Sequence, residues 1–179
     1  MRLSEQQLAA RGGEIQALLR PIARVSTGPA WKKFTIGTTG MVFGTHDGTY
    51  HSASYKDSRF ATTAHGYQAN YFEAWRRESK SHYVVEKMYL SIYDATGSEE
   101  SELLCLHCDP TLAVSSENYM YKRGPHLHMS MAGYPFARAH LAVCGADVET
   151  VLKSSASLHA AMAWAIQMIR DEVFALIVG

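Results

Sequence analysis

Alternating apolar and polar side chains in the second half of the sequence constrain the fold more than any other feature. The alternation runs through residues 87–93, 102–108, 126–131 and 140–144. Successive side chains of a strand point to opposite faces, so each segment predicts a strand with one apolar and one polar face. We therefore expect a four-stranded antiparallel meander whose strands share a single apolar face.

Helices at the two ends of the chain supply the layer that this apolar face requires. Near the N-terminus, Ser4 and Gln7 form a capping-box pattern in front of an apolar stripe. Across 156–177 a second stripe recurs at helical spacing, made of Leu158, Met162, Ala165, Ile166, Ile169, Val173 and Leu176. The predicted fold class is α+β, with the N-terminal helix, the meander and a long amphipathic C-terminal helix packed on one face.

The chain length predicts one domain with three parts. A chain of 179 residues is typical of a single domain, here 1–179. The N-terminal helix occupies 1–25, and the meander with its helix occupies 83–179. Between them, 26–82 is rich in glycine, serine, threonine and aromatic residues and is expected to be largely irregular. A hairpin across 33–43 and a helix across 67–80 are its candidate elements.

Charge and composition exclude several classes of function. Lys+Arg and Asp+Glu both number 17, and this balance argues against a general nucleic-acid or membrane-surface binder, which needs a basic excess. The longest apolar run, 160–166, is far shorter than the roughly 18 residues of a membrane span. The three cysteines and the lack of a signal-peptide pattern predict a reducing, cytoplasmic location.

The polar face of the predicted meander carries most of the residues with chemical potential. His126 and His128 are two positions apart on one strand, so their imidazoles project to the same side. Cys105 and His107 share that face on the preceding strand, and Cys108 ends the strand beside a loop. Three chemistries fit this set.

The first chemistry is zinc binding. Cys105, Cys108, His126 and His128 can form a tetrahedral Cys₂His₂ set, which is a standard zinc site. A bend at Asp109 and Pro110 would turn Cys108 toward the other ligands. In this case the chain is a non-catalytic, zinc-stabilised binding module.

The second chemistry is nucleophilic catalysis by a thiolate. Cys108 is the first choice because it lies at a strand end, and Cys105 with His107 is the alternate pair. A neighbouring imidazolium lowers the pKa of a thiol, and the carboxylate of Glu117 can orient an imidazole. Cys144, which ends an apolar strand, is interpreted as a small core residue.

The third chemistry needs only the histidines and a basic pair. His126 and His128 can cleave RNA by general acid–base catalysis while Lys122 and Arg123 hold the phosphate. The order strand, turn, Gly-x-His-x-His and helix is similar to that of a family of small bacterial toxins of toxin–antitoxin pairs. That resemblance implies a histidine-dependent ribonuclease.

A second resemblance concerns the ordered residues Cys108, Glu117, His126 and His128, in the segments LHCDP at 106–110 and YKRGPHLH at 121–128. They resemble the Cys-Glu-His-His group, the E2-like proteins of bacterial ubiquitin-like conjugation operons. The His-Pro-Asn tripeptide that precedes the cysteine of a typical E2 is missing before Cys108.

This resemblance implies an E2-like transferase, with antiphage defence as its setting, and it is our principal prediction. Cys108 would accept a ubiquitin-like protein from an E1-like enzyme, Glu117 would orient a histidine, and His126 or His128 would activate the thiol or the attacking amine. No cofactor is expected for this carrier, and nucleic acid and membranes are not expected partners. The ribonuclease and the zinc module are the alternatives.

Overall fold

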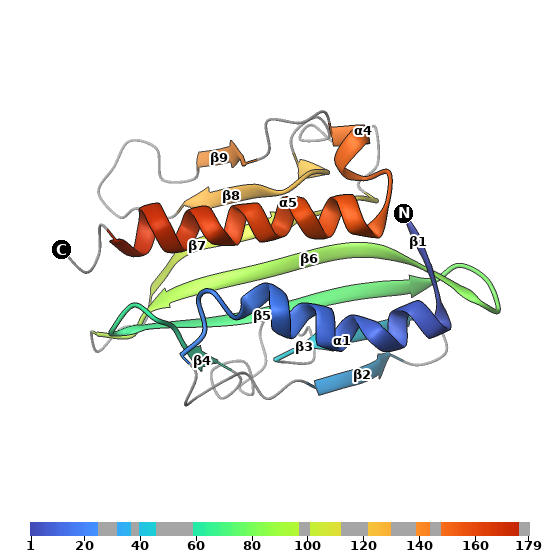
Figure 1. Ribbon diagram of the computed structural model, residues 1–179, viewed down its shortest axis with the longest axis horizontal. Coiled ribbons are helices and arrows are strands. Elements are labelled where there is room, and N and C mark those ends of the chain that lie inside the picture. Colours follow the sequence, from blue (N-terminus) through green and yellow to red (C-terminus); the bar gives the residue numbers. More distant parts are fainter. Residues whose placement is uncertain are drawn as a thin grey trace.

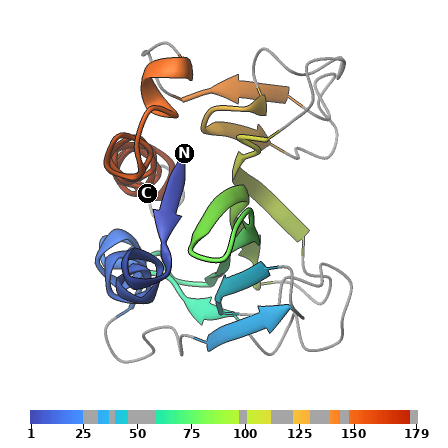
Figure 2. The ribbon, with the colours of Figure 1, turned by 90° about the vertical axis from the view of Figure 1, so that its right-hand side faces the viewer.

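The computed structural model is α+β, with helices on one side of an antiparallel sheet (Figure 1). It describes residues 1–24, 32–36, 40–45, 59–96, 101–111, 122–129, 139–143 and 148–175. Seen edge-on in Figure 2, the two long helices lie side by side and cover the same face of the sheet. This confirms the fold class and the N-terminal helix. No described helix is long and apolar enough to cross a membrane.

The N-terminal helix α1 spans Glu5–Leu19 and begins at the predicted capping box. The Ser4 hydroxyl accepts a hydrogen bond from the Gln7 backbone N–H at 3.2 Å, and the Gln7 side chain accepts one from the Ser4 N–H at 2.9 Å. The helix buries Leu8, Ile15, Leu18 and Leu19. Its fifth buried residue is a charged one, Arg11.

The described residues form one sheet of nine strands, which corrects the predicted four-stranded meander. Its main path is β2-β3-β5-β6-β7-β8-β9, with β1 paired to β6 and β4 to β5, and every pair is antiparallel. The strands are β1 (Arg2–Ser4), β2 (Lys32–Ile36), β3 (Gly40–Gly44), β4 (Phe60–Ala61), β5 (Tyr67–Arg77), β6 (His82–Asp94), β7 (Ser101–Cys108), β8 (His126–Met129) and β9 (Ala139–Ala142).

The additional strands come mostly from 26–82, the region that was expected to be irregular. The predicted hairpin is confirmed, because β2 pairs with β3 in a register that joins Ile36 to Gly40. The candidate helix at 67–80 is instead the long strand β5. Side chains 69–75 of β5 are buried on both faces, and the apolar–polar alternation of residues 67–71 breaks at Phe72 and Glu73.

The C-terminal α-helix is shorter than the predicted span of 156–177. Helix α5 covers Ser155–Met168 after a capping box between Ser154 and Ser157, and a short helix, α4 (Val148–Val151), precedes it. The chain then continues as a π-helical segment, η2 (Ile169–Phe174). Ile169 and Phe174 are both buried, and their five-residue spacing fits the wider turn of a π-helix.

The main core lies between this helical layer and the sheet. Leu104, Leu106, Leu127 and Val143 are buried in one cluster with Leu158, Met162, Ala165 and Ile166 of α5 and Ile169 of η2. The predicted shared apolar face therefore exists. It is incomplete at the β9 edge of the sheet, where Leu141 is 49% exposed and Met129 is half-buried.

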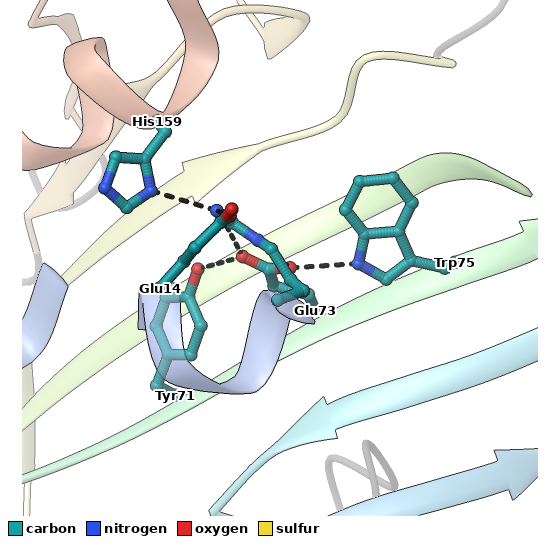
Figure 3. A network of polar contacts seen from close by, with 6 residues as sticks. Glu14, Tyr71, Glu73, Trp75 and His159 are labelled. Atoms are coloured by element: carbon teal, nitrogen blue, oxygen red, sulfur yellow. Dashed lines mark hydrogen bonds and ion pairs between the residues drawn. The ribbon is translucent and has the colours of Figure 1, made fainter. Parts of the chain in front are cut away.

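A buried ion pair joins α1 to β5 inside this core (Figure 3). Arg11 donates to Glu73 at 3.0 Å from Nε and at 2.6 Å from Nη2, and Glu73 is fully buried. Glu73 also accepts from the Tyr71 hydroxyl at 2.6 Å and from the Trp75 indole at 2.9 Å. The Nδ1 of His159, on α5, lies 2.9 Å from Arg11 Nη1.

These contacts keep the groups in defined charge states. Burial alone lowers the pKa of Arg11, but the Glu73 charge and its hydrogen bonds outweigh burial, and the net pKa is raised. Burial, followed by the charge of Glu73, raises the pKa of Tyr71, which stays a neutral donor. The pKa of His159 is lowered by burial and by the Arg11 charge, so His159 faces Arg11 as a neutral acceptor.

Candidate metal centre

Three histidines meet on the face of the sheet opposite the helices. His107 lies on β7 and is the register partner of His126 on β8, and His128 follows two residues later. Their neighbours in sequence, Leu106 and Leu127, point into the helix-side core. Because side chains alternate, the imidazoles occupy the other face. One ring nitrogen from each histidine lies within 4.8 Å of the other two.

The facing nitrogens are His107 Nδ1, His126 Nε2 and His128 Nε2. His128 Nε2 lies 3.0 Å from His126 Nε2 and 3.2 Å from His107 Nδ1. Zinc–nitrogen bonds of about 2.0–2.1 Å at tetrahedral angles place ligand nitrogens about 3.3–3.4 Å apart. Two of the three nitrogen pairs therefore have nearly the spacing of a metal site.

The outer nitrogens of two rings decide which protonation states are present. His126 Nδ1 lies 2.8 Å from the carbonyl oxygen of Gly124, and a carbonyl only accepts, so Nδ1 carries the proton. His107 Nε2 lies 2.8 Å from Asp109 Oδ2, which favours a proton on Nε2. This second contact has ion-pair distance, but its direction lies outside the range of a good hydrogen bond.

In their neutral forms, with the proton on the outer nitrogen, His107 and His126 both direct lone pairs at His128 Nε2. Such an arrangement needs one positive or partly positive centre between the rings. It can be a proton on His128 Nε2 or a metal ion bound to all three nitrogens. The three histidines lie close enough to hold a metal ion.

Aromatic rings and a carboxylate support His107. The Tyr89 ring stacks on His107 with centroids 4.0 Å apart, and Phe72 stacks on Tyr89 at 4.9 Å. Burial, and then the Asp109 charge, raises the pKa of Tyr89, so the hydroxyl remains protonated. His126 and His107 are buried and His128 is half-buried.

Neither predicted cysteine ligand joins this cluster. Among the described residues the group of potential ligands consists of the three histidines alone, so His107 takes the place expected for a cysteine. Cys105 lies on the same face and is the register partner of His128. Its Sγ accepts a hydrogen bond from Ser91 at 3.4 Å, and burial raises the pKa of its thiol to about 12.

Cys108, the predicted nucleophile, lies in the helix-side core. Strand β7 continues through it without the bend expected at Asp109, so Cys108 shares the parity of Leu104 and Leu106. Its Sγ donates to the carbonyl oxygen of Arg123 at 3.0 Å, away from the histidine face. Glu117 and Cys144 lie outside the described residues.

Of the predicted basic pair, Arg123 has its side chain engaged elsewhere. Arg123 forms an ion pair with Glu149 of α4 and donates to the Pro110 carbonyl oxygen at 3.5 Å. Lys122 is half-buried, and its carbonyl oxygen accepts from the Asp109 N–H at 3.0 Å. Of the predicted residues, the structure thus brings together His126, His128 and the alternate His107.

Asp109 and Tyr89 are the residues that the sequence analysis did not select. The sequence indicated Asp109 only as the end of a strand and, with Pro110, as a bend. The same spacing that identified the pair of His126 and His128 also relates His107 to Asp109, two positions later. That spacing was the available signal.

We expect the Cys105 thiol to be unreactive in the folded protein. With its pKa raised to about 12, the thiolate fraction at pH 8 is about 1,000-fold below that of an ordinary thiol with a pKa near 9. Iodoacetamide labelling, assigned to each cysteine by fragment mass spectrometry, should be slow in buffer, accelerate as the pH approaches 12, and be fast in urea. Rapid labelling of Cys105 in native protein at pH 8 would restore it as a candidate nucleophile.

Comparison with protein-family models, curated proteins and solved structures finds no match to this chain.

Proposed function

We propose that this protein binds a divalent transition metal, with zinc as the first candidate. The ligands are His107 Nδ1, His126 Nε2 and His128 Nε2. The observation that supports the proposal is the convergence of three imidazole nitrogens, two of which carry lone pairs fixed by partners on the far side of their rings. Imidazole is a preferred ligand of zinc, copper, nickel and iron, whereas magnesium and calcium select oxygen.

The chemistry of such a centre follows from its ligand charge. Three neutral histidines would leave the full +2 charge on the ion, and the charge polarises a bound water or carbonyl group. Zinc with three protein ligands keeps one position for such a group and lowers the pKa of bound water to about 7. Metal-assisted hydrolysis is therefore the reaction class that this ligand set favours.

The E2-like carrier remains the alternative proposal. It is supported by the order of Cys108, Glu117, His126 and His128 in the sequence and by the α+β architecture. It requires a thiolate beside an imidazole, and the burial of Cys108 on the helix side favours the metal instead. The ribonuclease alternative uses the same histidines, and a chelator distinguishes it, because cleavage by histidines alone survives metal removal.

Zinc binding by matched variants tests the proposal. Untagged protein is expected to carry about one zinc per chain by elemental analysis. His126→Ala should weaken zinc binding by more than the roughly 10–100-fold lost when a supporting residue is removed, because it removes a ligand. Cys108→Ala is the control and should bind zinc as the unmodified protein does.

Two results would contradict this assignment. Undiminished zinc binding by His126→Ala would show that the metal binds at another site. Loss of zinc in Cys108→Ala, with its fold retained, would show that Cys108 is a zinc ligand. A reducible adduct between an activated ubiquitin-like protein and Cys108, absent in Cys108→Ala, would favour the carrier.

A further inference from the structure

We infer that Asp109 and Tyr89 are positioning residues for the metal centre: they hold His107 in the orientation and tautomer that present Nδ1 to the ion. The inference rests on the proposed zinc site and adds two residues that are not ligands. Coordination through Nδ1 requires the proton of neutral His107 to sit on Nε2. Asp109 Oδ2 lies at ion-pair distance from that nitrogen, 2.8 Å from Nε2.

The chain itself explains why Asp109 reaches this nitrogen. Asp109 follows His107 by two residues, at the end of β7. Its backbone N–H donates to the Lys122 carbonyl oxygen at 3.0 Å, which fixes the start of the turn. A carboxylate behind a ligating histidine stabilises the ring N–H, orients the ring and makes the coordinating nitrogen more basic.

Tyr89 restrains His107 and Asp109 together. Its ring lies against the His107 ring, 4.0 Å away and tilted by 25°, and the Asp109 charge acts on its hydroxyl. The carboxylate is therefore close to the same residue that sets the plane of the imidazole. Phe72 extends this stack on the other side of Tyr89.

His126 provides the comparison within the same site. Its outer nitrogen is held by a backbone carbonyl, that of Gly124 at 2.8 Å, which no side-chain substitution removes. The tautomer of His107 depends on a side chain instead. A change at Asp109 should therefore disturb one ligand and leave the other two in place.

The variant Asp109→Asn tests this role. When the asparagine NH₂ group faces His107 Nε2, the nitrogen must accept, the proton moves to Nδ1, and this ligand is lost. When the amide oxygen faces Nε2, the original tautomer is kept. We therefore expect zinc affinity to fall by about 10–100-fold, with the stoichiometry unchanged. Tyr89→Phe, which keeps the stacked ring and removes the hydroxyl, should lose less.

The measurements are competition with a chromophoric chelator and ¹⁵N NMR of the histidine rings in metal-free protein. NMR should show the proton of His107 on Nε2 in the unmodified chain and partly on Nδ1 in Asp109→Asn, a change that a merely structural role would not cause. Asp171→Asn removes the same charge from the exposed η2 segment and serves as the control.

The outcomes separate this inference from the proposed function. If the unmodified protein binds no zinc, the proposed function fails. If it binds zinc and Asp109→Asn equals it in affinity and in the His107 tautomer, the positioning role is overturned and the metal site stands. Should Asp109→Asn fail to fold, Tyr89→Phe decides, and unchanged affinity in that variant would overturn the role.

Discussion

Replacing Glu73 by glutamine is expected to lower the free energy of unfolding by about 3–5 kcal/mol. Glu73 has no exposed surface and accepts four hydrogen bonds, two of them from Arg11, which is also buried. The amide cannot accept at both ends, and it leaves the buried guanidinium with only the exposed carboxylate of Glu14 as a counter-charge. Urea titration at constant pH, with the slope compared between variants, measures the loss.

An exposed ion pair in the same sheet provides the control. Arg76 and Glu86 contact each other at 2.9 Å, but both side chains are substantially exposed. Glu86→Gln should therefore cost no more than about 1 kcal/mol. The double variant Arg11→Met with Glu73→Leu should recover only part of the loss. It avoids desolvating charges, but it removes the Glu73 acceptor from the buried Tyr71 hydroxyl and Trp75 indole. A Glu73→Gln cost as small as that of Glu86→Gln would show that the pair is not desolvated.

The burial and pairing of Glu73 could not be predicted from the sequence. Its partner Arg11 lies 62 residues away, and no local pattern marks either residue as buried. The segment around it places Tyr71, Glu73 and Trp75 on the helix side and Phe72 on the other. In a strand buried on both faces the alternation of polarity need not continue, and in β5 it breaks after Tyr71, so the pattern of a half-buried strand is incomplete there.

Strand parity accounts for most of what the sequence predicted of the site. It placed His107, His126 and His128 on one face, and the structure brings their nitrogens together. Cys108 does not join them, because the predicted zinc set required a bend at Asp109 and Pro110 that would turn Cys108 to this face. Strand β7 instead keeps its register with β6 up to the pair of Met88 and Cys108. Parity alone would have assigned Cys108 to the core.

Zinc is expected to stabilise the folded protein strongly. A ligand that binds only the native state adds about 4 kcal/mol to the unfolding free energy at 1,000 times its Kd. For a chain of this size about 1 kcal/mol moves Tm by about 2–4 °C, so Tm should rise by about 8–16 °C. The ion would tie β8 to β7, and β8 is a strand of four residues near the sheet edge.

Thermal melts in chelator, in zinc and in magnesium measure this effect. Magnesium should leave Tm unchanged, because it selects oxygen ligands and a histidine cluster offers none. His126→Ala should melt at the same temperature with and without zinc, since the gain requires the intact triad. Cys108→Ala should keep the full zinc-dependent rise, even if its own Tm is lowered by the loss of packing in the core. A zinc-induced rise that persists in His126→Ala would place the stabilising ion elsewhere on the chain and remove the support for the three-histidine centre.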